Sequence, residues 1–501
     1  VTPNNGLITA IIGPSDIAIT VATPQSLLNN YINSQILIAN AGANIINHNL
    51  TPVITLGDDI ASLAVEENTN VILATADDID FTIDIDEAPT GTASIDANRI
   101  AANTVVNLSD TVIAPTLAAG ASSTDVGDTF FWDLGTPGGG WYEADATLAG
   151  LTIQQNDQGG RGQARALDGS LTITVDNEGS GALQTAPLEI DGNDIEANYT
   201  GNQESTAITV TDGGNPTFTG SAAAMSYQFN GALAHANNIE AQVSDQLVRA
   251  QVMSSNPATL EPAFAGVLSV SGNEISSSGT GNSADNSILL AGSVSLDGNN
   301  VVRDNDAYFQ PGSILIDVEA DLVVHTVQQN VAGGILETST DEVLIQGLVE
   351  SSDGGNLDVS DNEISSTARG NVASSEISNG GPATSIAGSS AIMNFQNNSA
   401  GQFPNEVNAA TVNTDILATV GNGAGLDDLF NETVITLSGN RVLSSALGNS
   451  ASQLLDLDAN ALDIGLTAAA LELDLTGLFG GPELLSDGGA TISNVQLNQT
   501  S

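Results

Sequence analysis

The chain has 501 residues and a formal net charge of −53, because 60 Asp and Glu residues face only 7 basic residues, all of them Arg. A chain this negative is repelled by phosphate backbones and anionic lipids, so we expect neither a nucleic-acid partner nor membrane insertion. The sequence has no Lys and no Cys, which excludes P-loop lysines, Schiff bases, thiol nucleophiles, zinc–thiolate sites and disulfides.

The composition favours a folded, repetitive β protein. Hydrophobic residues make up 41% of the chain, which argues against disorder, but aromatic residues make up only 4%. Small and β-branched side chains must therefore fill the core, which suits thin stacked layers better than one large globule. The absence of cysteine and the strong acidity together indicate an exported prokaryotic protein, located outside the cell or on its surface.

The N-terminal region, residues 1–75, is expected to be an apolar capping or assembly segment. Its first 57 residues carry one formal charge, Asp16, and contain several apolar runs. Such runs would be aggregation-prone edge strands if they stayed exposed. Two interpretations remain open: the segment folds back as a cap, or it pairs with a neighbouring subunit by strand addition. Within it, Thr23 before Pro24 is typical of a helix start.

An acidic row follows, in which Asp78, Asp80, Asp84 and Asp86 share one face of a predicted strand over residues 79–85. Neighbours two positions apart on such a face are about 6.7 Å from each other. These carboxylates repel one another unless they are solvated or bridged, and Ca²⁺ takes oxygen ligands of this kind. The row is therefore a candidate Ca²⁺ site, and Ca²⁺ is the one cofactor that the sequence suggests. A solvated outer face is the simpler alternative.

Five segments share one pattern, an apolar residue, two small or acidic residues, an Asn, a polar residue and another apolar residue. They span residues 95–100, 190–195, 270–275, 359–364 and 437–442. A second Asn follows nine positions after the first in every copy, at Asn107, Asn202, Asn282, Asn371 and Asn449. Gly precedes this second Asn in the last four copies, whereas the first has Val106 and is interpreted as a degenerate, capping copy.

Each copy predicts a strand, a sharp turn and a second strand, because apolar residues alternate around Asn and Gly. We therefore expect an all-β fold, a parallel β-helix (β-solenoid) over residues 76–455, with stacked Asn side chains at its corners. With the usual coil of about 20 residues, each repeat would hold about four coils in a rod about 80 Å long. The alternative is a string of tandem β-sandwiches. Residues 456–501 are expected to be a C-terminal cap and a β-strand tail.

No catalytic constellation emerges from the residues. His48, His235 and His325 lie far apart without zinc-binding spacing. The aromatic group Trp132, Trp141 and Tyr142 would either stack on a sugar or cover a solenoid end. Chance carboxylate pairs leave glycoside cleavage open, but few cations are present to hold an acidic polysaccharide. We expect the protein not to be an enzyme.

The repeated motif resembles the β-strand-repeat surface proteins of marine and other Gram-negative bacteria. The resemblance covers about residues 90–455 and implies a secreted β-helical adhesin or appendage protein. It does not imply functional residues.

These observations lead us to expect a structural subunit of an extracellular filament, tubular appendage or surface layer. The partner would be another copy of the chain, joined through uncharged terminal strands. A secreted β-helical adhesin that binds surface polysaccharide is the alternative, and a polysaccharide lyase or hydrolase is a more distant one.

Overall fold

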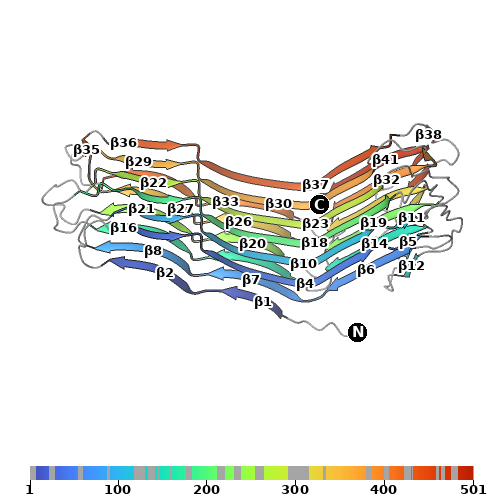
Figure 1. Cartoon of the computed structure of the whole chain (residues 1–501), viewed down its shortest axis with the longest axis horizontal. Helices are drawn as coiled ribbons and strands as arrows, with labels where there is room; N and C mark the ends of the chain where they lie inside the picture. Colours follow the sequence, from blue (N-terminus) through green and yellow to red (C-terminus); the bar gives the residue numbers. More distant parts are fainter. Residues whose placement is uncertain are drawn as a thin grey trace.

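The chain forms a parallel β-solenoid in which strands of successive coils stack in register (Figure 1). This computed structural model describes residues 7–21, 29–54, 60–86, 91–117, 130–133, 141–144, 146–156, 161–176, 183–211, 220–230, 238–253, 264–291, 315–330, 335–379, 386–399, 406–421, 430–431, 433–458, 462–463, 469–474 and 483–499. Within these ranges the regular elements are all strands. The expected β-solenoid is thus confirmed and the tandem β-sandwich alternative is wrong. The helix start at Thr23 and the residue His235 lie outside the described residues.

Five sheets, here called A to E, each take one strand from every coil. Sheet A contains β1 (Leu7–Ile12), β7 (Val71–Asp77), β15 (Arg161–Leu167), β20 (Asn238–Ser244), β26 (Ile335–Asp341) and β33 (Glu406–Val412). Sheet B contains β2 (Ser15–Val21), β8 (Ile79–Asp86), β16 (Ser170–Asp176), β21 (Leu247–Met253), β27 (Leu344–Val349) and β34 (Asp415–Val420). Sheet C contains β3 (Asn30–Asn33), β9 (Ala93–Asp96), β17 (Leu188–Asp191), β22 (Val267–Ser271), β29 (Asn356–Ser360) and β36 (Val434–Ser438).

The other two sheets complete each coil. Sheet D contains the long strands β4 (Ile36–Leu50), β10 (Arg99–Ile113), β18 (Asp194–Thr211), β23 (Glu274–Ala291), β30 (Glu363–Asn379) and β37 (Arg441–Asp456). Sheet E contains β6 (Ile60–Asn68), β14 (Leu148–Asn156), β19 (Ala222–Asn230), β25 (Leu322–Asn330), β32 (Ser390–Ser399) and β41 (Ala490–Gln499). Sheets A to C form one arm of a bent plate and sheet E the other, and the strands of sheet D run through both (Figure 1).

The coil is much larger than expected. The second Asn of each sequence repeat lies opposite the second Asn of the next repeat, as Asn107 pairs with Asn202 and Asn202 with Asn282. One repeat is therefore one coil, and the expectation of four coils per repeat and an 80 Å rod is wrong. The six strands of a sheet span only about 24 Å along the stacking axis. The motif occurs once per repeat because it builds a single corner of a coil with five sides.

The segments expected as terminal regions are parts of the same sheets. Residues 7–68 form the first coil and residues 406–499 the sixth, so the sheets run without interruption past positions 76 and 456. The motif copy with Val106 lies in the second coil, between β4 and β18. The structure therefore contradicts its interpretation as a terminal, capping copy.

Apolar side chains fill three cores in the described residues. The largest lies between sheets A and B on one side and sheet C with the first half of sheet D on the other. A second core packs the last part of sheet D against sheet E, around Ile113, Ile208 and Leu322. A third lies on the other face of sheet E, around Leu151 and Val323. Strand alternation explains the first core, since Phe81, Ile83 and Ile85 of β8 point inward.

Short strands accompany the five sheets. They are β5 (Val53–Ile54) and β11 (Thr116–Leu117), β12 (Phe130–Asp133) and β13 (Trp141–Ala144), β28 (Ser352–Asp353) and β35 (Phe430–Asn431), β31 (Ile386–Ala387) and β38 (Leu462–Asp463), and the antiparallel set β24 (Leu315–Glu319), β39 (Ala469–Asp474) and β40 (Glu483–Gly488). In the β12–β13 pair, Trp132 lies opposite Tyr142 in the register.

The Gly column beside the second Asn is needed for close approach between coils. A Cβ at Gly281 would lie 2.5 Å from the carbonyl oxygen of Gly370 and 3.0 Å from the Oδ1 atom of Asn330. Neither neighbour can move without breaking the stacking of the next coil. The same column holds Gly201, Gly281, Gly370 and Gly448 in the last four coils.

We predict that Gly281→Ala lowers the free energy of unfolding by about 2 kcal/mol, because the added methyl group overpacks the joint between coils. The urea midpoint of unfolding, followed by circular dichroism, measures the loss. Gly42→Ala is the control, since its Cβ would meet only the Val105 carbonyl oxygen at 3.2 Å. Equal losses in the two variants would contradict the prediction.

Candidate assembly interface

The first Asn of each repeat forms a buried ladder at the corner between sheets C and D. The Nδ2 atoms of Asn98, Asn193 and Asn273 each donate to the Oδ1 atom of the Asn in the next coil, at 2.8–2.9 Å. The residue before the Asn has a positive φ in every coil, as at Ala97 (53°) and Gly192 (63°). This left-handed residue turns the chain sharply and directs the Asn side chain inward. The stacked Asn side chains expected from the sequence are therefore confirmed.

The second Asn forms a parallel ladder within sheet D. Its members are Asn44, Asn107, Asn202, Asn282, Asn371 and Asn449, and each Nδ2 donates to the next Oδ1 at 2.7–2.8 Å. Asn44 extends the ladder into the first coil, which the sequence repeat did not reveal. Buried amides are costly unless they are paired, so this ladder fixes the register of all six coils.

A third ladder was missed in the sequence. It runs through the end of sheet E with Asn68, Asn156, Asn230, Asn330, Asn398 and Asn498, as the register of the sheet shows. It is linked to the second ladder, since Asn230 Nδ2 donates to Asn282 Oδ1 at 2.8 Å. A Gln two positions before the Asn in five of these strands is the sequence signal that could have revealed it.

These Gln residues form a fourth column with the opposite direction. Gln228 Nε2 donates to Gln154 Oε1 at 2.9 Å, and Gln328 Nε2 to Gln228 Oε1 at 2.8 Å. The same holds for Gln396 and Gln496. Each amide of the Gln column thus donates toward the preceding coil, whereas the three Asn ladders donate toward the following coil. The first coil has Glu66 in this column, and its Oε2 atom accepts from Gln154 Nε2 at 2.5 Å.

At both ends of the stack, no described strand pairs with the outer edge of the end coil, and the two ends differ in the groups that they offer. The N-face is formed by β1, β2, β3, β4 and β6, and the C-face by β33, β34, β36, β37 and β41. On the C-face, Asn449 Nδ2 donates to Leu497 O and Asn498 Oδ1. In the earlier coils this Nδ2 also donates to the Asn Oδ1 of the following coil, but Asn449 lies in the last coil. On the N-face, Asn44 Oδ1 has no earlier coil to donate to it. The second ladder therefore ends in a donor on the C-face and begins with an acceptor on the N-face.

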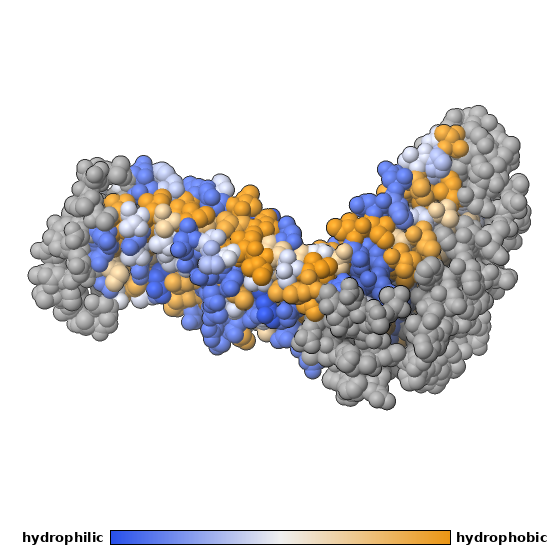
Figure 2. Space-filling view, turned by 90° about the horizontal axis from the view of Figure 1, so that it is seen from below, coloured by the Kyte–Doolittle hydropathy of each residue, from blue (hydrophilic) through white to orange (hydrophobic). Residues whose placement is uncertain are grey.

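Exposed large apolar side chains gather on these two faces. Among the described residues, Val267 is the single one on another coil. On the N-face they are Leu7, Ile11, Tyr31, Ile36, Ile45, Val53 and Val65, and on the C-face Val412, Leu417, Val434, Ile435, Leu437, Val442, Leu443, Leu447, Leu454 and Ile492. Figure 2, seen from below onto the first coil, shows such side chains in orange along the bent plate. Apolar surface of this extent is typical of a protein–protein contact.

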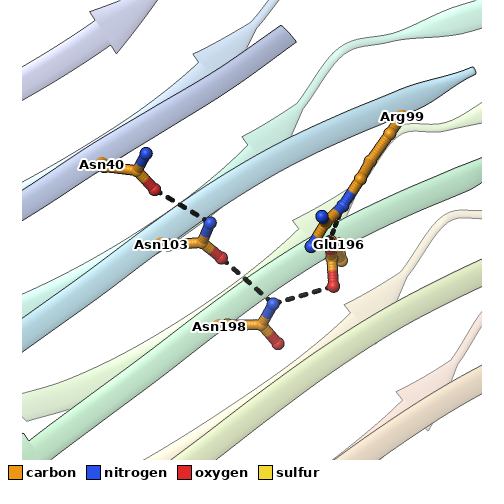
Figure 3. Close-up of polar contacts among 5 residues, drawn as sticks. All are labelled: Asn40, Arg99, Asn103, Glu196 and Asn198. Carbon is orange, nitrogen blue, oxygen red and sulfur yellow. Dashed lines mark hydrogen bonds and ion pairs between the residues drawn. The ribbon is translucent and has the colours of Figure 1, made fainter. Parts of the chain in front are cut away.

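The outer surface is polar and carries its own ladder. Asn103 Nδ2 donates to Asn40 Oδ1 at 3.0 Å, and Asn198 Nδ2 donates to Asn103 Oδ1 at 3.1 Å (Figure 3). Arg99 forms an ion pair with Glu196. Arg441 pairs likewise with Glu363 at 3.1 Å, so the Arg that follows the first Asn in these two repeats neutralises an acid of a neighbouring coil.

A buried carboxyl lies between sheets D and E. Glu204 is 2% exposed, and its Oε2 accepts from Thr206 Oγ1 at 3.0 Å. Burial raises the pKa of Glu204 to about 8, although hydrogen bonds from Ser226, Thr206 and Asn286 favour the charged form. The carboxyl group is therefore protonated at neutral pH.

The acidic row lies on the outer face of the turn into β8 and of β8 itself. Asp78 has a φ of 54° in that turn, and Asp80 accepts from Ser170 Oγ on β16. Burial, Asp86 and Asp176 raise the pKa of Asp84. No group of three or more His, Cys, Asp or Glu side chains suited to a metal is found in the described ranges. Calcium binding at this row stays a prediction.

Of the three histidines, the structure describes His48 and His325, which lie on different sheets. His48 Nδ1 lies 2.7 Å from Ser62 Oγ, and His325 is buried in sheet E. Across the described ranges, no helix is both long and apolar enough to cross a membrane. No family model, curated protein or solved structure matches the chain.

We predict that Asn282→Ala lowers the free energy of unfolding by about 3 kcal/mol, because Asn202 and Asn230 lose a buried acceptor. Asn103→Ala, in the outer ladder, removes the same side chain where water can replace it, so we expect a loss below about 1 kcal/mol. Urea titration of both variants checks the difference. Similar midpoints would show that the buried ladder does not govern stability.

The raised pKa of Glu204 predicts that stability falls as pH rises. The folded chain holds a proton up to about pH 8 that the unfolded chain releases near pH 4.5, so this residue lowers the free energy of unfolding by about 1 kcal/mol per pH unit between those values. Glu204→Gln removes this slope, so its advantage over the natural chain should grow from pH 5 to pH 8. Thermal melts at several pH values test this. Glu67→Gln, an exposed control, should keep the natural slope.

Proposed function

We propose that the chain is a structural subunit of an extracellular filament, in which the C-face of one copy stacks on the N-face of the next. The proposal is supported by two end coils that match in cross-section and whose outer edges pair with no described strand. A continuous rod of this kind needs no catalytic site. Its role would be mechanical, as a stiff, protease-resistant shaft with few Arg and no Lys for trypsin-like enzymes to cleave.

The apolar columns of the core would continue across the joint. The register places Ile8 in the column that ends at Val407, and Ile17 in the column that ends at Ile416. These four side chains are only partly buried in a single chain and border the main core. Stacking would bury them as their counterparts are buried in the middle coils, which favours association.

The amide ladders would also continue. Asn449 Nδ2 would donate to Asn44 Oδ1 of the next copy, and Asn498 Nδ2 to Asn68 Oδ1. Backbone groups at the open edges of the five sheets would pair in the same step, as unpaired edges tend to do. The contact is head-to-tail and does not close, so it propagates a fibre.

The charge distribution supports joining at the ends and not at the sides. The strands of the N-face carry three acids, Asp16, Glu66 and Glu67, and those of the C-face carry three acids and one Arg, namely Glu406, Asp415, Asp456 and Arg441. Exposed acids of the middle coils, such as Asp110 and Asp191, would keep neighbouring fibres apart. Asp16 would meet Asp415 across the joint, but on the outer face, where water and salt screen the pair.

Electron microscopy of concentrated protein tests the proposal. Six strands per copy at about 4.8 Å each predict an axial rise of about 29 Å per subunit. Fibre diffraction should show the strand spacing along the axis. A chain that stays monomeric by light scattering at high concentration, with salt and calcium present, would overturn the proposal.

We predict that Val442→Asp abolishes assembly. Val442 is 50% exposed on the C-face and would meet Leu37 of the next copy, where an unpaired carboxylate is costly to bury. The minimum concentration for fibres, measured by sedimentation, should rise at least tenfold.

Val267→Asp is the matched control, because Val267 is 39% exposed on the fourth coil, away from both faces. It should assemble like the natural chain. Fibres of Val442→Asp at the natural concentration would contradict stacking through these faces.

A further inference from the structure

The Gln column has Glu66 in its first coil, and this residue lacks the amide N–H donor of the Gln residues. In the second to fifth coils, the amide Nε2 donates both to the preceding rung and to a backbone carbonyl of sheet D, for example Gln228 to Gln154 Oε1 and to Ser283 O. Glu66 has a carboxyl oxygen where these rungs have an N–H donor. Its Oε1 atom is buried without a hydrogen-bond partner.

The missing donor matters at the joint between copies. Gln496 Nε2 donates to Gln396 Oε1 at 2.8 Å, so its own Oε1 is the acceptor at the end of the column. In a head-to-tail stack, Glu66 of the next copy would lie against this Oε1. An ionised Glu66 would place acceptor against acceptor, whereas a protonated one would donate its O–H and continue the column.

We propose that Glu66 makes the contact between copies depend on protonation: copies stack when its carboxyl is protonated and separate when it ionises. This inference rests on the proposed head-to-tail filament. It assigns the regulation of that contact to one residue, the single acid in a column otherwise made of Gln.

Among the described residues packed against Glu66, no cation would stabilise its charged form in the joint. The elements packed against β6 are β4, β10 and β14, whose titratable or charged residues are His48, Arg99 and Asp110. His48 bonds to Ser62 instead, and Arg99 pairs with Glu196. On β6 itself, Glu67 is exposed and adds only negative charge.

The preceding copy brings no cation to Glu66 either. Its β41 has no charged residue, and its β37 carries Arg441 and Asp456 at the two ends of the strand. Arg441 already pairs with Glu363. The joint would therefore bury an unpaired carboxylate unless Glu66 binds a proton.

The environment of Glu66 within one chain already favours the proton. Glu66 is 2% exposed, and this burial raises its pKa to about 7, although the hydrogen bond from Gln154 and the nearby Leu108 backbone partly offset the rise. Stacking on an acceptor would raise the pKa further. Because one proton is bound per joint, the minimum concentration for assembly should rise about tenfold per pH unit once Glu66 ionises.

The test compares the natural chain with Glu66→Gln and Glu67→Gln between pH 5.5 and 9, at fixed salt. Sedimentation should give a natural chain whose minimum concentration for fibres rises about tenfold per pH unit above about pH 7. Glu66→Gln restores the donor, so its minimum concentration should be independent of pH in this range. Glu67→Gln makes the same change of charge on the exposed neighbour and should behave like the natural chain.

Proton uptake gives a second, independent readout. Assembly near pH 8 should take up close to one proton per subunit in the natural chain and in Glu67→Gln, but none in Glu66→Gln. If the minimum concentration depended equally on pH, or proton uptake were equal, in Glu66→Gln and the natural chain, the proposed role of Glu66 would be wrong. The proposed filament would not be affected by that result. Absence of fibres from all three chains at every pH would instead overturn the filament itself.

Discussion

The pairing of buried side-chain amides between coils is the constraint on which the rest of this structure depends. A parallel sheet alone tolerates slippage of its register, because its backbone groups can pair in any alignment. An Asn buried between coils does not, because a shift of one residue leaves its donor and acceptor unpaired. Three Asn ladders and a Gln column thus hold six long coils at one register. This permits a core of Ala, Val and Ile in which few rings are needed.

The same constraint explains how coils of different length share one fold. The rungs of the first ladder are separated by 95, 80, 89 and 78 residues along the chain, yet their side chains lie directly on one another. The sequence between rungs can vary because register is set anew at each Asn. Selection for the ladders thus restricts only a few positions per coil, and the Gly beside the second Asn is one of them.

The sequence predicted the β-solenoid and two Asn positions of the repeat, because both Asn residues recur at a fixed offset within a local motif. It did not predict the coil length, since a motif that forms one corner does not tell how many corners a coil has. Nor did it reveal the position of Glu66 in the Gln column. Glu differs in type from the Gln residues of its column, and only the three-dimensional register places it with them. The third ladder was not predicted because its Asn residues keep no fixed offset from the repeated motif.

Because the Asn ladders and the Gln column donate in opposite directions, the two ends of the stack are chemically different. A head-to-head contact would bring two N-faces together and offer no Asn449 donor to Asn44, and a tail-to-tail contact would offer no Asn44 acceptor to Asn449. Only one relative orientation satisfies both kinds of column. Every fibre of this protein would then be polar, with two chemically distinct tips, and a fragment used as a seed could extend only by copies in its own orientation. A cell that exposes one tip at its surface would thereby fix the direction of growth of the whole appendage.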